Sequence, residues 1–110
     1  MENVKQIKTY LEAINEALVE EMTNNNDIII LGEDIGQYGG AFGVTKGLFE
    51  KFGPLRVLDT PISENSFVGI ATGAAMAGLR TIVEIMFMDF ITLAMDQIVN
   101  HLTKFSYIYG

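Results

Sequence analysis

Glu64 is the one acidic residue in an otherwise apolar loop within the segment "RVLDTPISENSF", residues 56–67. The loop follows a predicted strand and precedes a predicted helix, the place where open parallel sheets bind ligands. Pro61, Ile62 and Phe67 solvate a charge poorly, so a carboxyl among them is suited to sharing a proton. The alternative is an ordinary acid at a helix N-terminus, favoured by the helix dipole. Position alone favours the second interpretation.

The glycine-rich segment "GEDIGQYGGAFG", residues 32–43, also follows a predicted strand, where a nucleotide-binding turn could lie. Its glycine spacing differs from the dinucleotide fingerprint, which enters a helix directly, and no Lys adjoins a Ser or Thr as in a phosphate-binding loop. We therefore interpret it as a flexible surface or interface loop.

Other reactive residue types give weaker signals. Ser63, Asp89 and His101 are the types found in a nucleophilic triad, but no Gly-x-Ser-x-Gly turn surrounds Ser63. A single histidine cannot form a metal site by itself, and no cysteine is present for thiolate chemistry, so we predict no metal ligand. Four methionines between residues 76 and 95 could form an adaptable binding surface, although core packing is the simpler interpretation.

Small residues recur on one predicted helix, "NSFVGIATGAAMAGLR", with Gly69, Gly73 and Ala77 at intervals of four. Glycine costs about 1 kcal/mol in helix propensity, so two of them on one face indicate close packing. The helix could pack in this way against its own sheet or against another subunit, and the pattern does not decide between these possibilities.

The hydrophobic pattern predicts helices alternating with strands that are continuous apolar runs. Helices are predicted over residues 6–23, 45–53, 65–79 and from about 91 toward the C-terminus, and strands over 28–31, 56–59 and 81–87. Thr45 is a possible cap of the second helix, and Gly53 its C-terminal glycine. This order predicts an α/β fold, a parallel sheet flanked by helices. Because three strands leave an exposed edge, we expect a truncated chain or one that depends on a partner.

Composition excludes several classes of function. The 110 residues suit one domain, and a net charge of −7 without a basic cluster argues against nucleic acid as a partner. A hydrophobic fraction of 49% and a mean hydropathy of +0.28 suggest apolar surface for a protein partner. The longest apolar stretch, residues 67–79, is shorter than the ~18 residues of a membrane span. With no signal peptide recognisable at the N-terminus, we expect a cytoplasmic protein without a membrane partner.

The motifs together resemble a known family. The run from "LGEDIGQYGG" through "DTPISENSF" and "GAAMAGLR", followed by "EIMFMDF" and "MDQIVNHLTKFSYIYG", is similar to the beta subunit of the thiamine-diphosphate-dependent 2-oxo acid dehydrogenases. That group contains the pyruvate, branched-chain 2-oxo acid and acetoin dehydrogenases. The similarity extends from about Ile7 to Gly110, with the motifs in family order and spacing. It implies a transketolase-like pyrimidine-binding fold.

The resemblance also implies the site residues. In this family the acid at the position of Glu64 hydrogen-bonds the pyrimidine nitrogen of thiamine diphosphate and favours the imino form, which deprotonates the thiazolium carbon. Phe90 matches an aromatic residue that packs on the pyrimidine ring, and Ile62 matches an apolar residue bordering it. Phe90 and Ile62 also have an ordinary core interpretation. Glu64 is thus the expected catalytic residue, and Glu64, Ile62 and Phe90 the expected cofactor-binding residues.

The implied activity needs other chains. No residue matches the family's Gly-Asp-Gly motif for magnesium and diphosphate, so an alpha subunit is expected to supply it in a heterotetramer. Residues 1–110 are expected to form part of the pyrimidine-binding domain, without the C-terminal domain that joins the lipoyl acyltransferase core. The implied reaction is oxidative decarboxylation of pyruvate or a related 2-oxo acid, or acetoin cleavage, with acyl transfer to lipoamide; we expect the isolated chain to be inactive. The alternative is a non-catalytic subunit that binds an alpha partner without cofactor.

Overall fold

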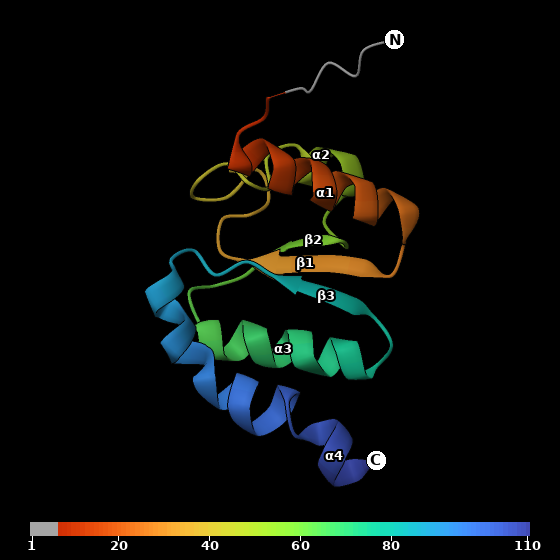
Figure 1. The fold of residues 1–110 in the computed structure, drawn as a ribbon, viewed down its shortest axis with the longest axis vertical. Helices are drawn as coiled ribbons and strands as arrows, with labels where there is room; N and C mark the ends of the chain where they lie inside the picture. Colours follow the sequence, from red (N-terminus) through yellow and green to blue (C-terminus); the bar gives the residue numbers. More distant parts are fainter. Residues whose placement is uncertain (1–6) are drawn as a thin grey trace.

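Three parallel strands lie between two helical layers in the computed structural model, which describes residues 7–110 (Figure 1). The strands are β1 (Ile28–Gly32), β2 (Val57–Asp59) and β3 (Arg80–Val83), in the order β2-β1-β3. Ile30 of the central strand is paired with Val57 on one side and Ile82 on the other. The predicted α/β class and parallel sheet are confirmed.

The first helical layer consists of α1 (Tyr10–Asn24) and α2 (Leu48–Phe52). α1 begins later than predicted because Thr9 caps it: the N–H of Glu12 donates to Thr9 Oγ1 over 3.2 Å, and the Thr9 N–H donates to the Glu12 carboxylate over 2.7 Å. The predicted start at residue 6 lies outside the described residues. Beneath this layer is a core of six buried side chains: Met22, Ile28, Ile30, Ile35, Leu48 and Val57.

Thr45 does not cap α2, contrary to the prediction. It is fully buried, and its hydroxyl donates a 2.8 Å hydrogen bond to the carbonyl of Ile35. Gly47, with a φ of 82°, precedes the helix instead. Gly53 ends the helix as predicted, with a φ of 78° and its N–H bonded to the carbonyl of Phe49.

The second helical layer covers the opposite face of the sheet (Figure 1). It contains α3 (Glu64–Met76), the 3₁₀ segment η1 (Met88–Ala94), the π-helical segment η2 (Gln97–Leu102) and α4 (Phe105–Tyr109). A second buried cluster, Phe67, Val68 and Ala94, joins α3 to η1. This layer begins directly at the carboxyl ends of the strands.

Two predicted elements differ in the structure. β3 ends at Val83, not at residue 87, because the neighbouring strand β1 stops at Gly32. The last hydrogen bond between the two runs from the Glu84 N–H to the Leu31 carbonyl. The predicted last helix is divided into η1, η2 and α4. At Thr103 the side-chain hydroxyl takes the carbonyl of Val99, and the backbone N–H bonds instead to Ile98, one residue further back than in an α-helix.

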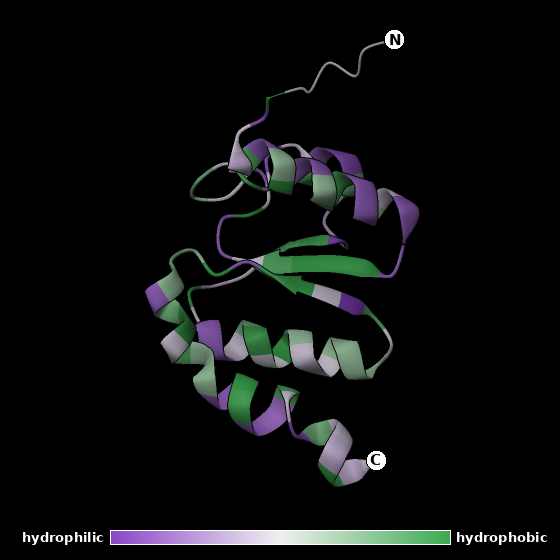
Figure 2. Cartoon of the chain, in the orientation of Figure 1, coloured by the Kyte–Doolittle hydropathy of each residue, from purple (hydrophilic) through white to green (hydrophobic). Residues whose placement is uncertain are grey.

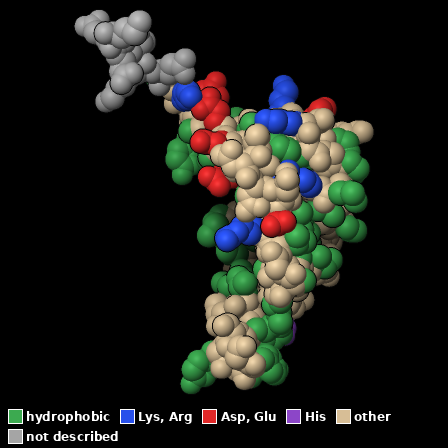
Figure 3. Space-filling view, turned by 90° about the vertical axis from the view of Figure 1, so that its right-hand side faces the viewer, with side chains coloured by type: hydrophobic (Ala, Val, Ile, Leu, Met, Phe, Trp, Pro, Cys, Tyr) green, Lys and Arg blue, Asp and Glu red, His purple; other side chains and the backbone are tan. Residues whose placement is uncertain are grey.

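Charge and hydrophobicity are distributed unevenly. Strand β1 is hydrophobic, whereas the start of β3 is hydrophilic and α1 carries many hydrophilic residues (Figure 2). In one space-filling view the acidic and basic side chains gather toward α1, and the C-terminal part of the chain shows mainly hydrophobic and uncharged atoms (Figure 3). Met76, Met88 and Met95 are exposed, so the prediction that these methionines pack in the core is wrong. Across residues 7–110, no helix has both the length and the apolar character that crossing a membrane requires.

Candidate functional site

The carboxyl ends of all three strands and the N-terminus of α3 meet at one edge of the sheet (Figure 1). A glutamate stands at three of these four ends: Glu33 follows β1, Glu84 follows β3, and Glu64 is the first residue of α3. Open parallel sheets bind ligands at this edge, and carboxyl groups there can exchange protons with a ligand.

Glu64 combines a helix N-terminal position with burial. Its side chain is only 6% exposed, and no hydrogen bond to its carboxylate is found among the described residues. Ser63, which precedes the helix, donates its hydroxyl to Ser66 Oγ over 2.7 Å and makes no side-chain bond to the helix N-terminus. In contrast to Glu33 and Glu84, Glu64 has no carboxylate oxygen among the buried oxygens that lack a partner in residues 7–110. The residue is thus largely enclosed while its carboxylate remains accessible to a ligand at this edge.

Glu33 is a candidate site residue that the sequence analysis missed. It is also 6% exposed, and its buried Oε1 has no hydrogen-bond partner among the described residues. Burial, followed by the negative charges of Glu64 and Asp34, raises the pKa of Glu33 above the ordinary glutamate value. The signal was available in "IIILGE", because Glu33 directly follows an apolar strand.

Glu84 extends the acidic group toward β3. Burial and the charge of Glu33 raise the pKa of the Glu84 carboxyl, and its buried Oε2 has no partner in the described part of the chain. The Glu84 carbonyl lies 2.8 Å from where a Cβ on Gly32 would be. Glycine at position 32 thus permits β1 and the end of β3 to approach closely. We group Glu33, Glu64 and Glu84 as the acidic site.

The part of the glycine-rich segment after Glu33 lies next to the end of β2. The Gly36 N–H donates a 2.7 Å hydrogen bond to Asp59 Oδ1 at the end of β2. Farther along, the Asn15 side chain on α1 donates to the carbonyls of Val44 and Lys46 over 2.6 and 3.1 Å. These bonds join the segment and the residues that follow it to β2 and α1.

The other two predicted cofactor-binding residues, Phe90 and Ile62, are more exposed than Glu64. Phe90 is partly exposed in η1, and its ring contacts that of Phe87 edge to face at 5.6 Å. Ile62 is 84% exposed on the loop before α3, so its core interpretation is wrong. His101 lies in η2 against the ring of Phe105, and no hydrogen bond joins it to Ser63 within residues 7–110. The structure therefore assembles no nucleophilic triad.

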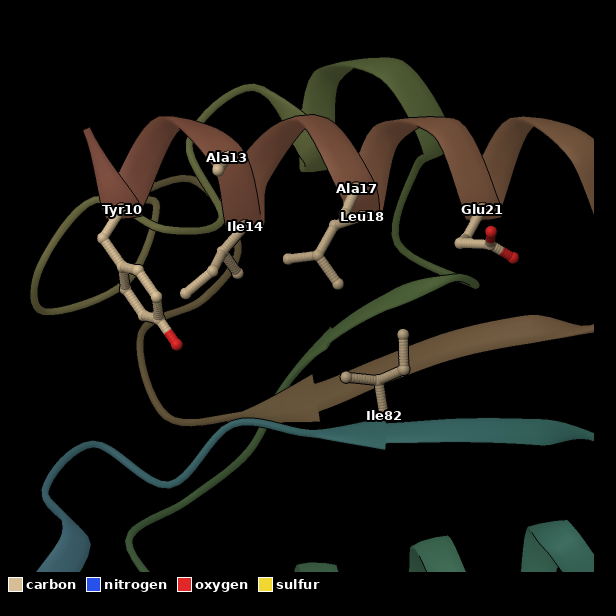
Figure 4. Close-up of a pocket in the computed structure, with 7 residues that line it drawn as sticks. All are labelled: Tyr10, Ala13, Ile14, Ala17, Leu18, Glu21 and Ile82. Carbon is tan, nitrogen blue, oxygen red and sulfur yellow. The ribbon is translucent and has the colours of Figure 1, made fainter. Parts of the chain in front are cut away.

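Two concave surfaces lie near the sheet. A cavity of about 390 Å³ lies between β2 and α3, beside the loop that precedes Glu64. Its lining is Leu31, Leu58, Asp59, Thr60, Pro61, Ser63, Ser66, Phe67 and Ile70. A second groove of about 330 Å³ lies between α1 and β3, where Ile14 and Leu18 point toward Ile82 (Figure 4). This groove is almost wholly apolar, so the acidic site and not the groove has the groups for proton chemistry.

The small residues of helix α3 differ in what surrounds them. A Cβ on Gly69 would lie 3.0 Å from the Gln97 side chain, so this glycine permits close packing of η2 within the chain. A Cβ on Gly73 would meet no atom within 4 Å, because that part of α3 is exposed. Packing within the described residues therefore explains Gly69 and leaves Gly73 available for another subunit.

Comparison with known proteins gives consistent similarities. The family model described as "Transketolase, pyrimidine binding domain" matches residues 6–107. The pyruvate dehydrogenase E1 component subunit beta of Chaetosphaeridium globosum is 54% identical over 90% of this chain and 30% of the relative. The chloroplastic subunit beta-3 of Oryza sativa subsp. japonica is 57% identical over 90% of this chain and 25% of the relative. The Rickettsia bellii subunit beta is 50% identical over 93% and 31%. The chain spans less than a third of the length of these relatives.

Proposed function

The chain belongs to the transketolase pyrimidine-binding domain family, and on that basis we propose that it provides the pyrimidine-binding part of a 2-oxo acid dehydrogenase beta subunit. The proposed cofactor is thiamine diphosphate and the proposed substrate is pyruvate, which the names of the similar beta subunits support. The observation that carries the proposal is that Glu64 is a largely buried residue at the carboxyl edge of the sheet, with Glu33 near it.

The residues at this edge fit a pyrimidine ring. Such a ring offers a nitrogen that can share a proton with a carboxyl and a flat face suited to stacking. Glu64 would hold a proton at the ring nitrogen, Phe90 would pack on the face of the ring, and the exposed Ile62 would border it. When bound, thiamine diphosphate supplies the electron sink that decarboxylation of a 2-oxo acid requires.

Glu33 contributes through its charge state. Because its pKa is raised, Glu33 accepts a proton more readily than an ordinary glutamate, and a neutral Glu33 removes one negative charge from beside Glu64. Glu33 thereby reduces the concentration of negative charge at the edge where we propose that the pyrimidine binds.

The proposed partner is an alpha subunit that binds the diphosphate and its magnesium, in a heterotetramer. No cluster of three or more His, Cys, Asp or Glu residues that could hold a metal ion occurs in residues 7–110. Exposed apolar side chains at the same edge, including Ile62, Met88 and Leu93, provide surface for that partner. The acyl group would pass to lipoamide on the acyltransferase core of the complex.

The decisive experiment replaces Glu64 with Gln in a full-length beta subunit that carries residues 1–110 of this chain, assembled with its alpha subunit. Glu64→Gln keeps the shape but cannot share a proton as a carboxyl does, so pyruvate decarboxylation should nearly disappear while assembly persists. Glu50→Gln, on the exposed surface of α2, is the matched control and should retain activity. Turnover like the wild type in Glu64→Gln would refute the proposal, and alpha binding that ignores thiamine diphosphate would favour a non-catalytic assembly subunit.

A further inference from the structure

Phe42 belongs to the glycine-rich segment. Hydrogen bonds hold the backbone on the N-terminal and C-terminal sides of this residue. Gly40 donates its N–H to the Asp34 carbonyl over 2.8 Å, and Thr45 donates its hydroxyl to the buried Ile35 carbonyl. The φ values of Gly40 and Gly43, 85° and 81°, lie in the region that favours glycine and set the path of the chain around Phe42. These bonds tie the backbone on both sides of Phe42 to Asp34 and Ile35, which follow β1.

The ring of Phe42 begins a chain of three aromatic side chains. It meets Phe87 edge to face, with 5.5 Å between ring centroids and 78° between ring planes. Phe87 meets Phe90 in the same way, at 5.6 Å and 77°. Both pairs have the geometry that the aromatic quadrupole favours. The aromatic chain, Phe42, Phe87 and Phe90, thus links the glycine-rich segment to η1 across the edge that holds the acidic site.

Burial in the core does not explain these contacts. Phe42 is 59% exposed, Phe87 46% and Phe90 37%, so exposure falls along the chain toward Phe90. Phe87 is joined to Phe90 a second time through the backbone, because the Phe90 N–H donates to the Phe87 carbonyl over 3.0 Å. Phe87 therefore contacts Phe90 in two ways, through its ring and through its backbone carbonyl.

We propose that Phe42 is a positioning residue for the pyrimidine site, which acts through Phe87 to hold the Phe90 ring in place for stacking on the ligand. This inference rests on the proposed function, because it takes Phe90 as the stacking residue. The inference gives the glycine-rich segment a role that does not involve binding phosphate. The segment carries Phe42, which supports Phe90 although Phe42 is not part of the acidic site.

The test measures thiamine diphosphate binding by titration calorimetry, with magnesium present, in the assembled alpha–beta complex that carries residues 1–110 of this chain. Phe42→Ala removes the first ring and should weaken binding about two- to tenfold, the range of one aromatic pair. Phe42→Tyr keeps the ring and should bind thiamine diphosphate with wild-type affinity. Phe42→Leu keeps much of the side-chain volume but lacks the ring, so its affinity should fall below that of the wild type. The KM for thiamine diphosphate should rise in Phe42→Ala with kcat little changed.

A double-variant comparison separates positioning from general destabilisation. If Phe42 acts through Phe87, then Phe42→Ala added to Phe87→Ala should cause no further loss of affinity. Tyr38→Ala is the matched control, since Tyr38 lies in the same segment, is 75% exposed and makes no aromatic pair within the described residues. Additive losses, or an equal loss in Tyr38→Ala, would overturn the inference.

The outcomes also distinguish this inference from the proposed function. If the wild-type complex does not bind thiamine diphosphate, the proposed function fails. If the wild type binds, Phe90→Ala weakens binding and Phe42→Ala does not, only the positioning role of Phe42 is refuted. Thermal unfolding of each variant identifies any that fails to fold, in which case Phe42→Leu provides the comparison with Phe42→Tyr.

Discussion

The backbone N–H of Gly36 donates a 2.7 Å hydrogen bond to Oδ1 of Asp59, which joins the glycine-rich segment to the end of β2. The two residues are 23 positions apart in the sequence. Their contact joins the segment that contains Phe42 to the end of the strand that leads, through the loop containing Ile62, to Glu64 at the start of α3.

Gly36→Ala should destabilise the fold by about 1–3 kcal/mol, the usual cost of overpacking. An added Cβ would lie 2.3 Å from Asp59 Oδ2, so the carboxylate must move and its hydrogen bond must lengthen. Urea unfolding of the purified chain measures the change in free energy. Gly36→Ala with wild-type stability would show that the contact between Gly36 and Asp59 is dispensable.

Removal of the buried hydroxyl of Thr45 should also destabilise the glycine-rich segment. Thr45→Val keeps the shape of the side chain but leaves the Ile35 carbonyl without its donor in a fully buried position, at a cost of about 1–3 kcal/mol. Thr92→Val is the matched control, since the Thr92 hydroxyl donates to the Asp89 carbonyl on the exposed surface. The two variants should differ clearly in urea unfolding, and equal losses would contradict this account.

Glu33 should make the stability of the protein decrease as the pH rises above the ordinary pKa of glutamate. Its pKa is raised in the folded state, mainly by burial, so the folded protein holds this proton more tightly than the unfolded chain. The stabilisation is complete below the unfolded pKa and is lost as the pH rises through the folded pKa. Glu84, whose pKa is also raised, contributes in the same direction.

Glu33→Gln tests this pH dependence, because an amide stays neutral at every pH. The free energy of unfolding of Glu33→Gln should fall less than that of the wild type between acidic and neutral pH. Glu20→Gln, on the exposed face of α1, should keep the wild-type dependence. If Glu33→Gln follows the same pH profile as the wild type, Glu33 does not titrate differently in the folded state.

Much of the fold follows from local sequence, since each strand is an apolar run and each helix has its own pattern. The end of β3 could not be predicted from its own residues, because it depends on where β1 stops. The division of the last helix was equally hidden: "TIVEIMF" and "MDQIVNHL" favour regular elements, and only the Thr103 hydrogen bonds show the change of helix type. Helix periodicity predicts which face of a helix is apolar, but it does not predict to which backbone carbonyl a side-chain hydroxyl donates a hydrogen bond.

The site was predicted in part for a related reason. Glu64 was noticed for its position after a strand and was selected through the family resemblance, whereas the positional rule applied to every strand would also have pointed to Glu33 and Glu84. What the sequence could not give is the mutual proximity of these acids, because it depends on the strand order β2-β1-β3. The link from Phe42 to Phe87 is likewise a property of the tertiary structure, since the two residues are 45 positions apart (87 minus 42).

Gly73→Ala should distinguish a subunit interface on α3 from simple exposure. Alanine favours the helix by up to about 1 kcal/mol over glycine, and its Cβ would meet no atom within 4 Å, so the chain itself should become more stable. If the exposed part of α3 packs closely against a partner subunit, the same methyl group should weaken assembly, measured by sedimentation of the alpha–beta mixture. Gly69→Ala is the comparison: its Cβ would lie 3.0 Å from the Gln97 side chain, which must shift, so its gain in stability should be smaller than that of Gly73→Ala. A Gly73→Ala chain that is more stable and assembles with unchanged affinity would show that this face of α3 makes no close contact with the partner.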